Sequence, residues 1–162
     1  WVLKNPSHLF ALDALLRVYP DALVIQTHRD ASTAIASVCS LAAQASAGWS
    51  TTFTGEVIGR DQLELWASGL ERFTATRARH DPAQFYDVSY ADLAADPVGT
   101  VEAAYAYFGL PFSGAAADAM RAYLGANRSR SAHRYTLGDF GLTAADVAAR
   151  FGALGRSTAE LR

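Results

Sequence analysis

Apolar residues recur along this chain at two spacings, one typical of buried strands and one typical of helices. Residues 22–27 contain a short apolar run with β-branched side chains, which predicts a strand. In residues 31–45 apolar side chains stand three and four positions apart, which predicts a helix, and Asp30 is suited to cap its start. Residues 1–4 have the pattern of a strand end, and residues 84–89 that of a further strand. Strands that alternate with helices predict an α/β fold with a parallel sheet.

The other helices are indicated by apolar stripes and by capping residues. Four apolar residues from Leu63 to Phe73 stand at helical spacing, so we expect a helix that begins at Asp61. Residues 46–59 precede it, and we expect them to form a loop long enough to act as a lid over a substrate. The remaining helix starts are expected at Ser7, Asp96, Ser113 and Thr143, the last in a capping box with Asp146.

Composition and charge narrow the class of protein. The chain has 162 residues, 51% of them hydrophobic, which is enough to fill the core of one domain. Its net charge of −2 gives no general attraction to nucleic acid, and no apolar run is long enough to span a bilayer. Cys39 is the lone cysteine, so there is no internal disulfide. We expect Cys39 to be a small core residue and the protein to be cytoplasmic.

The junction between the strand at 22–27 and the helix at 31–45 has the residues of an anion site. Arg29 carries a planar guanidinium that matches phosphate oxygens, and free N–H groups at a helix start favour negative charge. Ser37 follows eight positions later, about two helical turns into the helix, and can offer its hydroxyl to the same anion. The alternative is an arginine in a salt bridge and a serine hydrogen-bonded to its own helix.

Three segments carry a family resemblance. The first is Val24-Ile25-Gln26-Thr27-His28-Arg29-Asp30 with Ile35-Ala36-Ser37, the second is Trp1-Val2-Leu3-Lys4-Asn5-Pro6, and the third is Asp87-Val88-Ser89-Tyr90-Ala91-Asp92-Leu93 with Asp96-Pro97. In these residues, and in this order, the chain resembles the sulfotransferases that use 3′-phosphoadenylyl sulfate (PAPS), and among them the broad bacterial branch.

The resemblance implies roles for four residues. Arg29 and Ser37 match the residues that hold the 3′-phosphate of the nucleotide in that family. Lys4 matches the lysine that reaches the phosphosulfate, and Tyr90 matches a tyrosine beside the adenine. The chain departs from the family at Ala31, where relatives often carry proline. Proline there only pre-sets the first helical residue, so its absence puts little in doubt.

The resemblance also implies a fold and indicates which part of the family's domain this chain covers. We expect the central and C-terminal part of a P-loop-like three-layer α/β fold, with residues 1–162 forming a single partial domain. The family's loop for the 5′-phosphosulfate precedes the lysine segment, and the chain has no such loop. Since Trp1 begins inside the pattern of a strand and Met120 is the lone methionine, we expect an excerpt of a longer protein, with that loop upstream of residue 1.

Three further candidates are less specific. His8 stands four residues after Lys4 and can act as a base near neutral pH, although the base can also lie upstream of Trp1. Arg128 and Arg130 can close over a nucleotide phosphate, at the position where cytosolic relatives have an Arg-Lys-Gly loop. The alternatives are a histidine without a catalytic duty and a solvated basic loop. The four histidines show no ligand spacing, so we expect no metal.

We therefore expect a sulfotransferase that moves a sulfuryl group from PAPS, its co-substrate, to a hydroxyl or amine. The expected partner is a small-molecule, lipid or carbohydrate acceptor, with no nucleic acid and no membrane span. Two alternatives stay open. One is a truncated, non-catalytic relative that still binds the nucleotide, and the other is a P-loop-like phosphotransferase, which would need magnesium and a complete phosphate loop.

Overall fold

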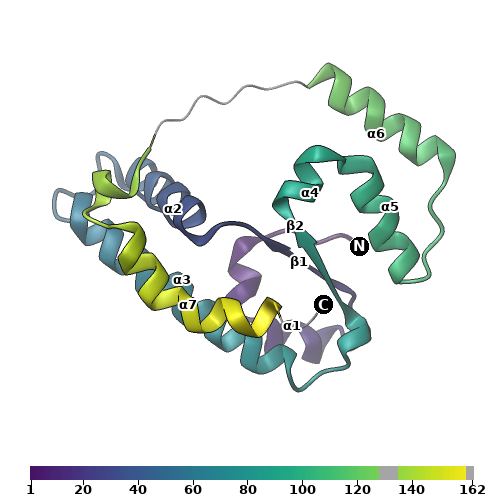
Figure 1. Ribbon diagram of the computed structural model, residues 1–162, viewed down its shortest axis with the longest axis horizontal. Coiled ribbons are helices and arrows are strands. Elements are labelled where there is room, and N and C mark those ends of the chain that lie inside the picture. The colour runs from purple at the N-terminus through teal and green to yellow at the C-terminus, as the bar shows by residue number, and fades with distance from the viewer. Residues whose placement is uncertain (128–134, 160–162) are drawn as a thin grey trace. The chain divides into compact units, whose positions relative to one another are not determined.

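The computed structural model describes residues 1–127 and 135–159, and residues 153–159 by their backbone alone. The described residues form two compact units (Figure 1). The first unit comprises residues 1–17, 30–79 and the described residues from 135 onward, and the second comprises residues 18–29 and 80–127. The chain passes from the second unit to the first between Arg29 and Asp30.

The second unit is built on two parallel strands, β1 (Val24–His28) and β2 (Phe85–Ser89). Their register runs from Val24 opposite Phe85 to His28 opposite Ser89. The Gln84 side chain donates hydrogen bonds to the carbonyl oxygens of Pro20 and Ala22, at 2.8 and 3.3 Å, which ties together the two segments that lead into the strands. The predicted α/β fold with a parallel sheet is therefore confirmed.

Three helices follow β2 in the second unit: α4 (Tyr90–Ala95), α5 (Pro97–Tyr107) and α6 (Gly114–Ala126). Each begins at a residue whose side chain accepts a hydrogen bond from the backbone of its first turn: Ser89, Asp96 and Ser113. A 3₁₀ helix, η2 (Pro82–Gln84), precedes β2 and is capped in the same way by Asp81. The predicted caps at Asp96 and Ser113 are confirmed.

The first unit is helical. It contains two long helices, α2 (Ala31–Ser46) and α3 (Gly55–Arg77), the 3₁₀ helices η1 (Pro6–Phe10) and η3 (Leu137–Phe140), and α7 (Ala144–Ala159). Helix α1 (Leu12–Val18) follows η1. The core of the unit consists of buried apolar side chains from α2, α3, η3, α7 and the link between the last two: Ile35, Cys39, Ile58, Leu63, Phe140, Leu142 and Val147.

Helix α7 packs along α3 in this unit (Figure 1). Arg150 of α7 donates hydrogen bonds to Glu64 and Glu71 of α3, which are seven residues apart and thus share one face of the helix. These two carboxylates, Glu71 foremost, raise the pKa of Arg150. The start of α7 has the predicted capping box, since Thr143 and Asp146 exchange side-chain and backbone hydrogen bonds at 2.8 and 3.2 Å.

Two predictions about local structure are wrong. Residues 1–5 belong to no strand: they are exposed, and Asn5, rather than Ser7, caps the first helical turn. A strand needs a neighbour for its backbone hydrogen bonds, and residues 1–4 have none among the described residues. The predicted loop at 46–59 is shorter, because α3 begins at Gly55. Among the described residues, no helix combines the length and the apolar character needed to cross a membrane.

Candidate functional site

The predicted anion site begins where β1 ends and α2 starts. Asp30 caps α2 as expected: its Oδ1 accepts hydrogen bonds from the backbone N–H and the hydroxyl of Thr33, both at 2.7 Å. Arg29 lies directly between the last strand residue, His28, and this cap. Arg29 is therefore the one residue between the end of the strand and the aspartate that caps the helix.

Arg29 lies against the ring of Tyr90. Its guanidinium carbon is 4.5 Å from the ring centroid, which is a cation–π contact. The register of the sheet explains this pair, because one step beyond His28 and Ser89 the next residues are Arg29 and Tyr90. No carboxylate of the described residues forms an ion pair with Arg29. The salt-bridge alternative is thus not found, and the N–H groups at the guanidinium edge are available to an anion.

Ser37 lies on α2, in the first unit, where its side chain is half-buried. Its hydroxyl has no hydrogen-bond partner among the residues that the structure describes. The alternative of a serine bonded back to its own helix is therefore not found either. That Ser37 and Arg29 share one phosphate stays a prediction.

Lys4 and His8 flank the first helical turn of the chain. Lys4 is exposed and precedes the cap residue Asn5, while His8 is half-buried within η1. Neither side chain forms a hydrogen bond or an ion pair with a described residue. Both are therefore available to a ligand, and their roles stay predictions. Arg128 and Arg130 lie outside the described residues.

Next to Arg29, on the same strand end, His28 is hydrogen-bonded to Asp87 of β2. The His28 Nε2 atom lies 2.6 Å from Asp87 Oδ1. The sequence alone predicts no role for this pair, because His28 has no metal-ligand spacing to the other histidines. The sequence places His28 one residue beyond the predicted strand 22–27 and Asp87 within the predicted strand 84–89, but the register that brings them together is given only by the structure.

Cys39 is completely buried in the core of the first unit, as predicted. Burial raises the pKa of its thiol to about 11, so the thiol stays protonated at neutral pH and cannot serve as a nucleophile. Among the described residues there is no group of three or more His, Cys, Asp or Glu side chains that is placed to hold a metal ion.

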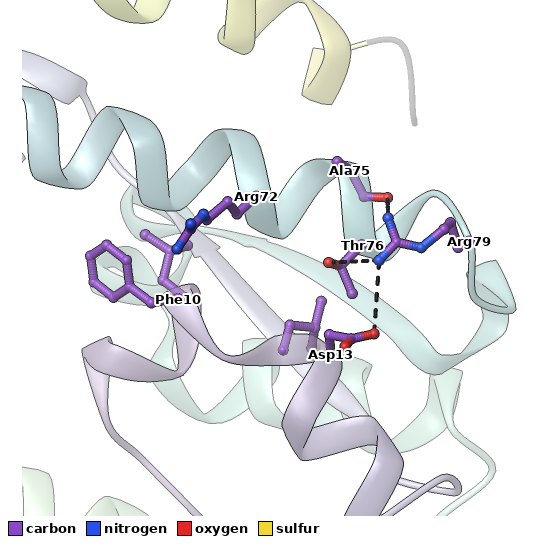
Figure 2. A pocket seen from close by; sticks show the side chains of 8 residues that line it. Phe10, Asp13, Arg72, Ala75, Thr76 and Arg79 are labelled. Atoms are coloured by element: carbon purple, nitrogen blue, oxygen red, sulfur yellow. Dashed lines mark hydrogen bonds and ion pairs between the residues drawn. The ribbon is translucent and has the colours of Figure 1, made fainter.

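A concave surface of about 330 Å³ lies between the N-terminal segment and the end of α3 (Figure 2). Its apolar side is formed by Leu9, Phe10 and Leu12. The guanidinium of Arg79 donates to the Ala75 carbonyl at 2.9 Å and to the Thr76 hydroxyl at 3.2 Å, and lies 3.8 Å from Asp13. Because three partners already hold Arg79, this cation joins the N-terminal segment to α3 and has little capacity left for an anion. Arg72 also lines the surface.

A second hollow of about 410 Å³ lies beside β2, in the second unit. Three of the residues that line it are acidic, Asp87, Asp92 and Asp96. Their charge opposes the binding of phosphate groups. Neither of the two hollows includes Arg29, so neither is the anion site expected from the sequence. The contact between Arg29 and Tyr90 is the part of that expected site that the structure describes.

Comparison with known proteins identifies the family to which the chain is similar. The sequence profile of the sulfotransferase family matches residues 1–114. The omega-hydroxy-beta-dihydromenaquinone-9 sulfotransferases Stf3 of Mycobacterium bovis and Mycobacterium tuberculosis are each 29% identical to the chain over 139 residues, which is 84% of the chain and 35% of the relative. The chain thus spans about a third of the length of these relatives.

Two solved structures are similar to the chain over 94% of its length. Sulfotransferase STF1 of Mycobacterium tuberculosis is 55% identical, with a TM-score of 0.83, and the chain covers 39% of it. Sulfotransferase STF9 of Mycobacterium avium is 27% identical, with a TM-score of 0.85 and 40% coverage. Similarity in sequence and similarity in fold therefore agree on the same kind of protein.

Proposed function

The chain belongs to the sulfotransferase family, and from this premise we propose that the whole protein transfers a sulfuryl group from PAPS to an acceptor and releases adenosine 3′,5′-bisphosphate. The observation that carries the proposal is Arg29. It directly follows β1 and has no carboxylate partner among the described residues. Its guanidinium lies on Tyr90, and the capped start of α2 follows it in the chain.

The donor nucleotide is held at its adenosine end by Arg29, Ser37 and Tyr90. Arg29 binds the 3′-phosphate through the N–H groups of its edge, while the face of its guanidinium stays on the Tyr90 ring. Ser37 donates its hydroxyl to the same phosphate. Tyr90 is 45% exposed although Arg29 lies against it, so ring surface remains for the adenine. Arg128 and Arg130 close over the nucleotide in this proposal.

The chemical step breaks the bond between sulfur and the phosphate oxygen and forms a bond between sulfur and the acceptor oxygen or nitrogen. Negative charge collects on the departing phosphate, and the Lys4 ammonium stabilises it there. The proton of the acceptor passes to a base, for which we propose His8. Both atoms that bond to sulfur must be held in line, which requires the donor's 5′ end to be fixed as well. None of these steps requires a metal ion.

The proposed acceptor is a small molecule that carries a hydroxyl or an amine, including lipid and carbohydrate acceptors. The name of the Stf3 relatives describes a hydroxylated menaquinone derivative as their acceptor. An isoprenoid or other lipid alcohol is therefore the first acceptor class to test here. We propose a cytoplasmic location, since the lone cysteine is buried and forms no disulfide.

A second candidate function is that of a non-catalytic relative, which keeps the adenosine end of the donor site and does not transfer the sulfuryl group. Such a protein would bind adenosine 3′,5′-bisphosphate more tightly than AMP, but would transfer nothing from PAPS.

The test is transfer from sulfur-35-labelled PAPS by the whole protein, in buffer with EDTA, to a panel of lipid alcohols, sugars and phenols. We expect labelled product from at least one acceptor, without added magnesium. Binding of adenosine 3′,5′-bisphosphate without any transfer would support the non-catalytic alternative. Phosphoryl transfer from labelled ATP that depends on magnesium would instead identify a phosphotransferase and contradict the proposal.

A further inference from the structure

The hydrogen bond between His28 and Asp87 takes no direct part in the proposed transfer. Its donor and acceptor atoms are 2.6 Å apart, and the two side chains are 33% and 31% exposed. So short a distance is typical of a hydrogen bond in which one group is charged. Because a carboxylate only accepts hydrogen bonds, the imidazole nitrogen is the donor.

The bond joins the two strands at the last level of their backbone ladder. His28 is opposite Ser89, and Asp87 is opposite Gln26, so the two side chains form a diagonal pair across neighbouring strands. After this level β1 is followed by Arg29, and β2 by Tyr90 as the first residue of α4. Arg29 and Tyr90 therefore lie just outside the part of the sheet that backbone hydrogen bonds hold.

Successive residues of a strand point to opposite faces of the sheet. The register places His28 and Asp87 on the same face of the sheet. Arg29 and Tyr90 come next in the chain, outside the two strands, and the guanidinium of Arg29 lies on the Tyr90 ring. His28 is bonded to Asp87, so the influence of His28 on a ligand of Arg29 passes through the backbone that joins the two neighbours.

We propose that His28 and Asp87 are a positioning pair, which keeps the end of β1 in register with β2 so that Arg29 stays in place on the Tyr90 ring for the 3′-phosphate of the nucleotide. Each strand has five residues, and strand ends open more easily than their centres. A cross-strand hydrogen bond at the last level opposes that opening. The inference rests on the proposed function, because it concerns the geometry of the same donor site.

The experiment changes His28 in the whole protein, since Asp87 has a further interaction of its own. His28→Phe keeps a ring on the strand but has no nitrogen to donate, whereas His28→Gln restores a donor at about the same reach. His80→Phe is the matched control, because His80 is also half-buried, lies in the second unit and is away from the strand ends. The readout is the ratio of the dissociation constants of AMP and adenosine 3′,5′-bisphosphate, measured by titration calorimetry, with the melting temperature of each variant recorded.

We expect His28→Phe to lower that ratio roughly tenfold, by weakening the bisphosphate complex, while the affinity for AMP changes less than about threefold. His28→Gln and His80→Phe should keep the ratio of the unmodified protein. A purely structural role would lower the melting temperature and leave the ratio unchanged. An unchanged ratio in a folded His28→Phe variant overturns this inference alone. If the unmodified protein does not prefer the bisphosphate over AMP, the proposed donor site is wrong and the inference is overturned with it.

Discussion

At the scale of single residues, the face of the Arg29 guanidinium lies on the ring of Tyr90, and its N–H groups at the edge are available to a ligand. The ring of Tyr90 attracts the cation without using any of its N–H groups, so the same guanidinium can still donate two parallel hydrogen bonds to a phosphate. The contact also removes freedom from a long side chain before the ligand arrives, which lowers the entropy lost on binding.

Replacing Arg29 should therefore weaken binding of the 3′-phosphate selectively. Hydrogen bonds that involve charged groups contribute about 1.5–3 kcal/mol each, so Arg29→Ala should weaken adenosine 3′,5′-bisphosphate binding at least roughly tenfold. Ser37→Ala should have a smaller effect, and Arg29→Lys should fall between, because a lysine lacks the planar fork. Calorimetry on the whole protein with the bisphosphate and with AMP measures this. Equal losses for both ligands would contradict a contact to the 3′ group.

Tyr90 should contribute to the binding of every adenine nucleotide. If its ring borders the base, Tyr90→Ala should weaken AMP and the bisphosphate alike, by about 1–3 kcal/mol of stacking, while Tyr90→Phe should keep most of the AMP affinity. Tyr123→Ala is the control, since Tyr123 is exposed on α6 of the same unit. Loss confined to the bisphosphate would mean that Tyr90 serves Arg29 and does not touch the base.

Lys4 should matter more for the rate than for binding. Its charge is needed chiefly as the phosphate departs, so Lys4→Ala in the whole protein should lower kcat by a larger factor than it raises the Kd of the nucleotide. Steady-state transfer from labelled PAPS at saturating substrate gives the first quantity and calorimetry the second. An unchanged kcat would remove Lys4 from the mechanism.

At the scale of helices and strands, two helical glycines differ in the space around them. A Cβ built on Gly59 of α3 would lie 2.0 Å from the backbone oxygen of Phe140, so this glycine allows η3 to contact the helix directly. A Cβ on Gly125 of α6 would meet nothing within 4 Å. Both positions are helical, with Gly59 in the second turn of α3 and Gly125 in the last turn of α6.

This contrast predicts opposite signs for one substitution. Gly125→Ala should raise the free energy of unfolding by up to about 0.5 kcal/mol, because alanine loses less backbone entropy than glycine and the position is near the helix end. Gly59→Ala should lower it by at least about 1–3 kcal/mol, because the backbone of η3 must move. Urea unfolding of the whole protein, followed by fluorescence, measures both. A stabilised Gly59→Ala variant would show that η3 does not pack on α3 as described.

At the scale of the whole molecule, the chain spans only 35% to 40% of its relatives, whereas it carries all the residues proposed for the adenosine end of the donor. Holding one end of a donor does not position its reacting sulfur. Placement of reacting groups accounts for about 7–11 kcal/mol of a typical catalysed barrier, so partial placement leaves most of that unrealised.

We therefore expect residues 1–162 alone to show no detectable transfer from labelled PAPS, under conditions in which the whole protein is active. Circular dichroism should first establish that the isolated chain is folded, so that loss of structure is not mistaken for loss of the site. Transfer by the isolated chain would contradict this expectation and would show that its own residues suffice for the 5′ end of the donor.

Local signals in the sequence determined most helices and the parallel sheet. The caps at Asp30, Asp96, Ser113 and Thr143 were predicted because each cap bonds to a backbone group two or three residues away, and such bonds depend on little else. The α/β class followed from periodicity alone, and the resemblance to sulfotransferases singled out Arg29 and Tyr90 before their contact was known.

Only the tertiary structure decided which residues meet across long distances in the chain. His28 and Asp87 are 59 positions apart, and their hydrogen bond depends on a strand register that a one-residue slip would destroy. The start of α3 was missed because glycine at positions 55 and 59 reads as a break, although the close packing of η3 favours glycine at the second of them. The prediction of a strand at residues 1–4 was wrong for a related reason. A helix forms its backbone hydrogen bonds within one segment. A strand forms them with a second strand, and the local sequence does not show which segment that is.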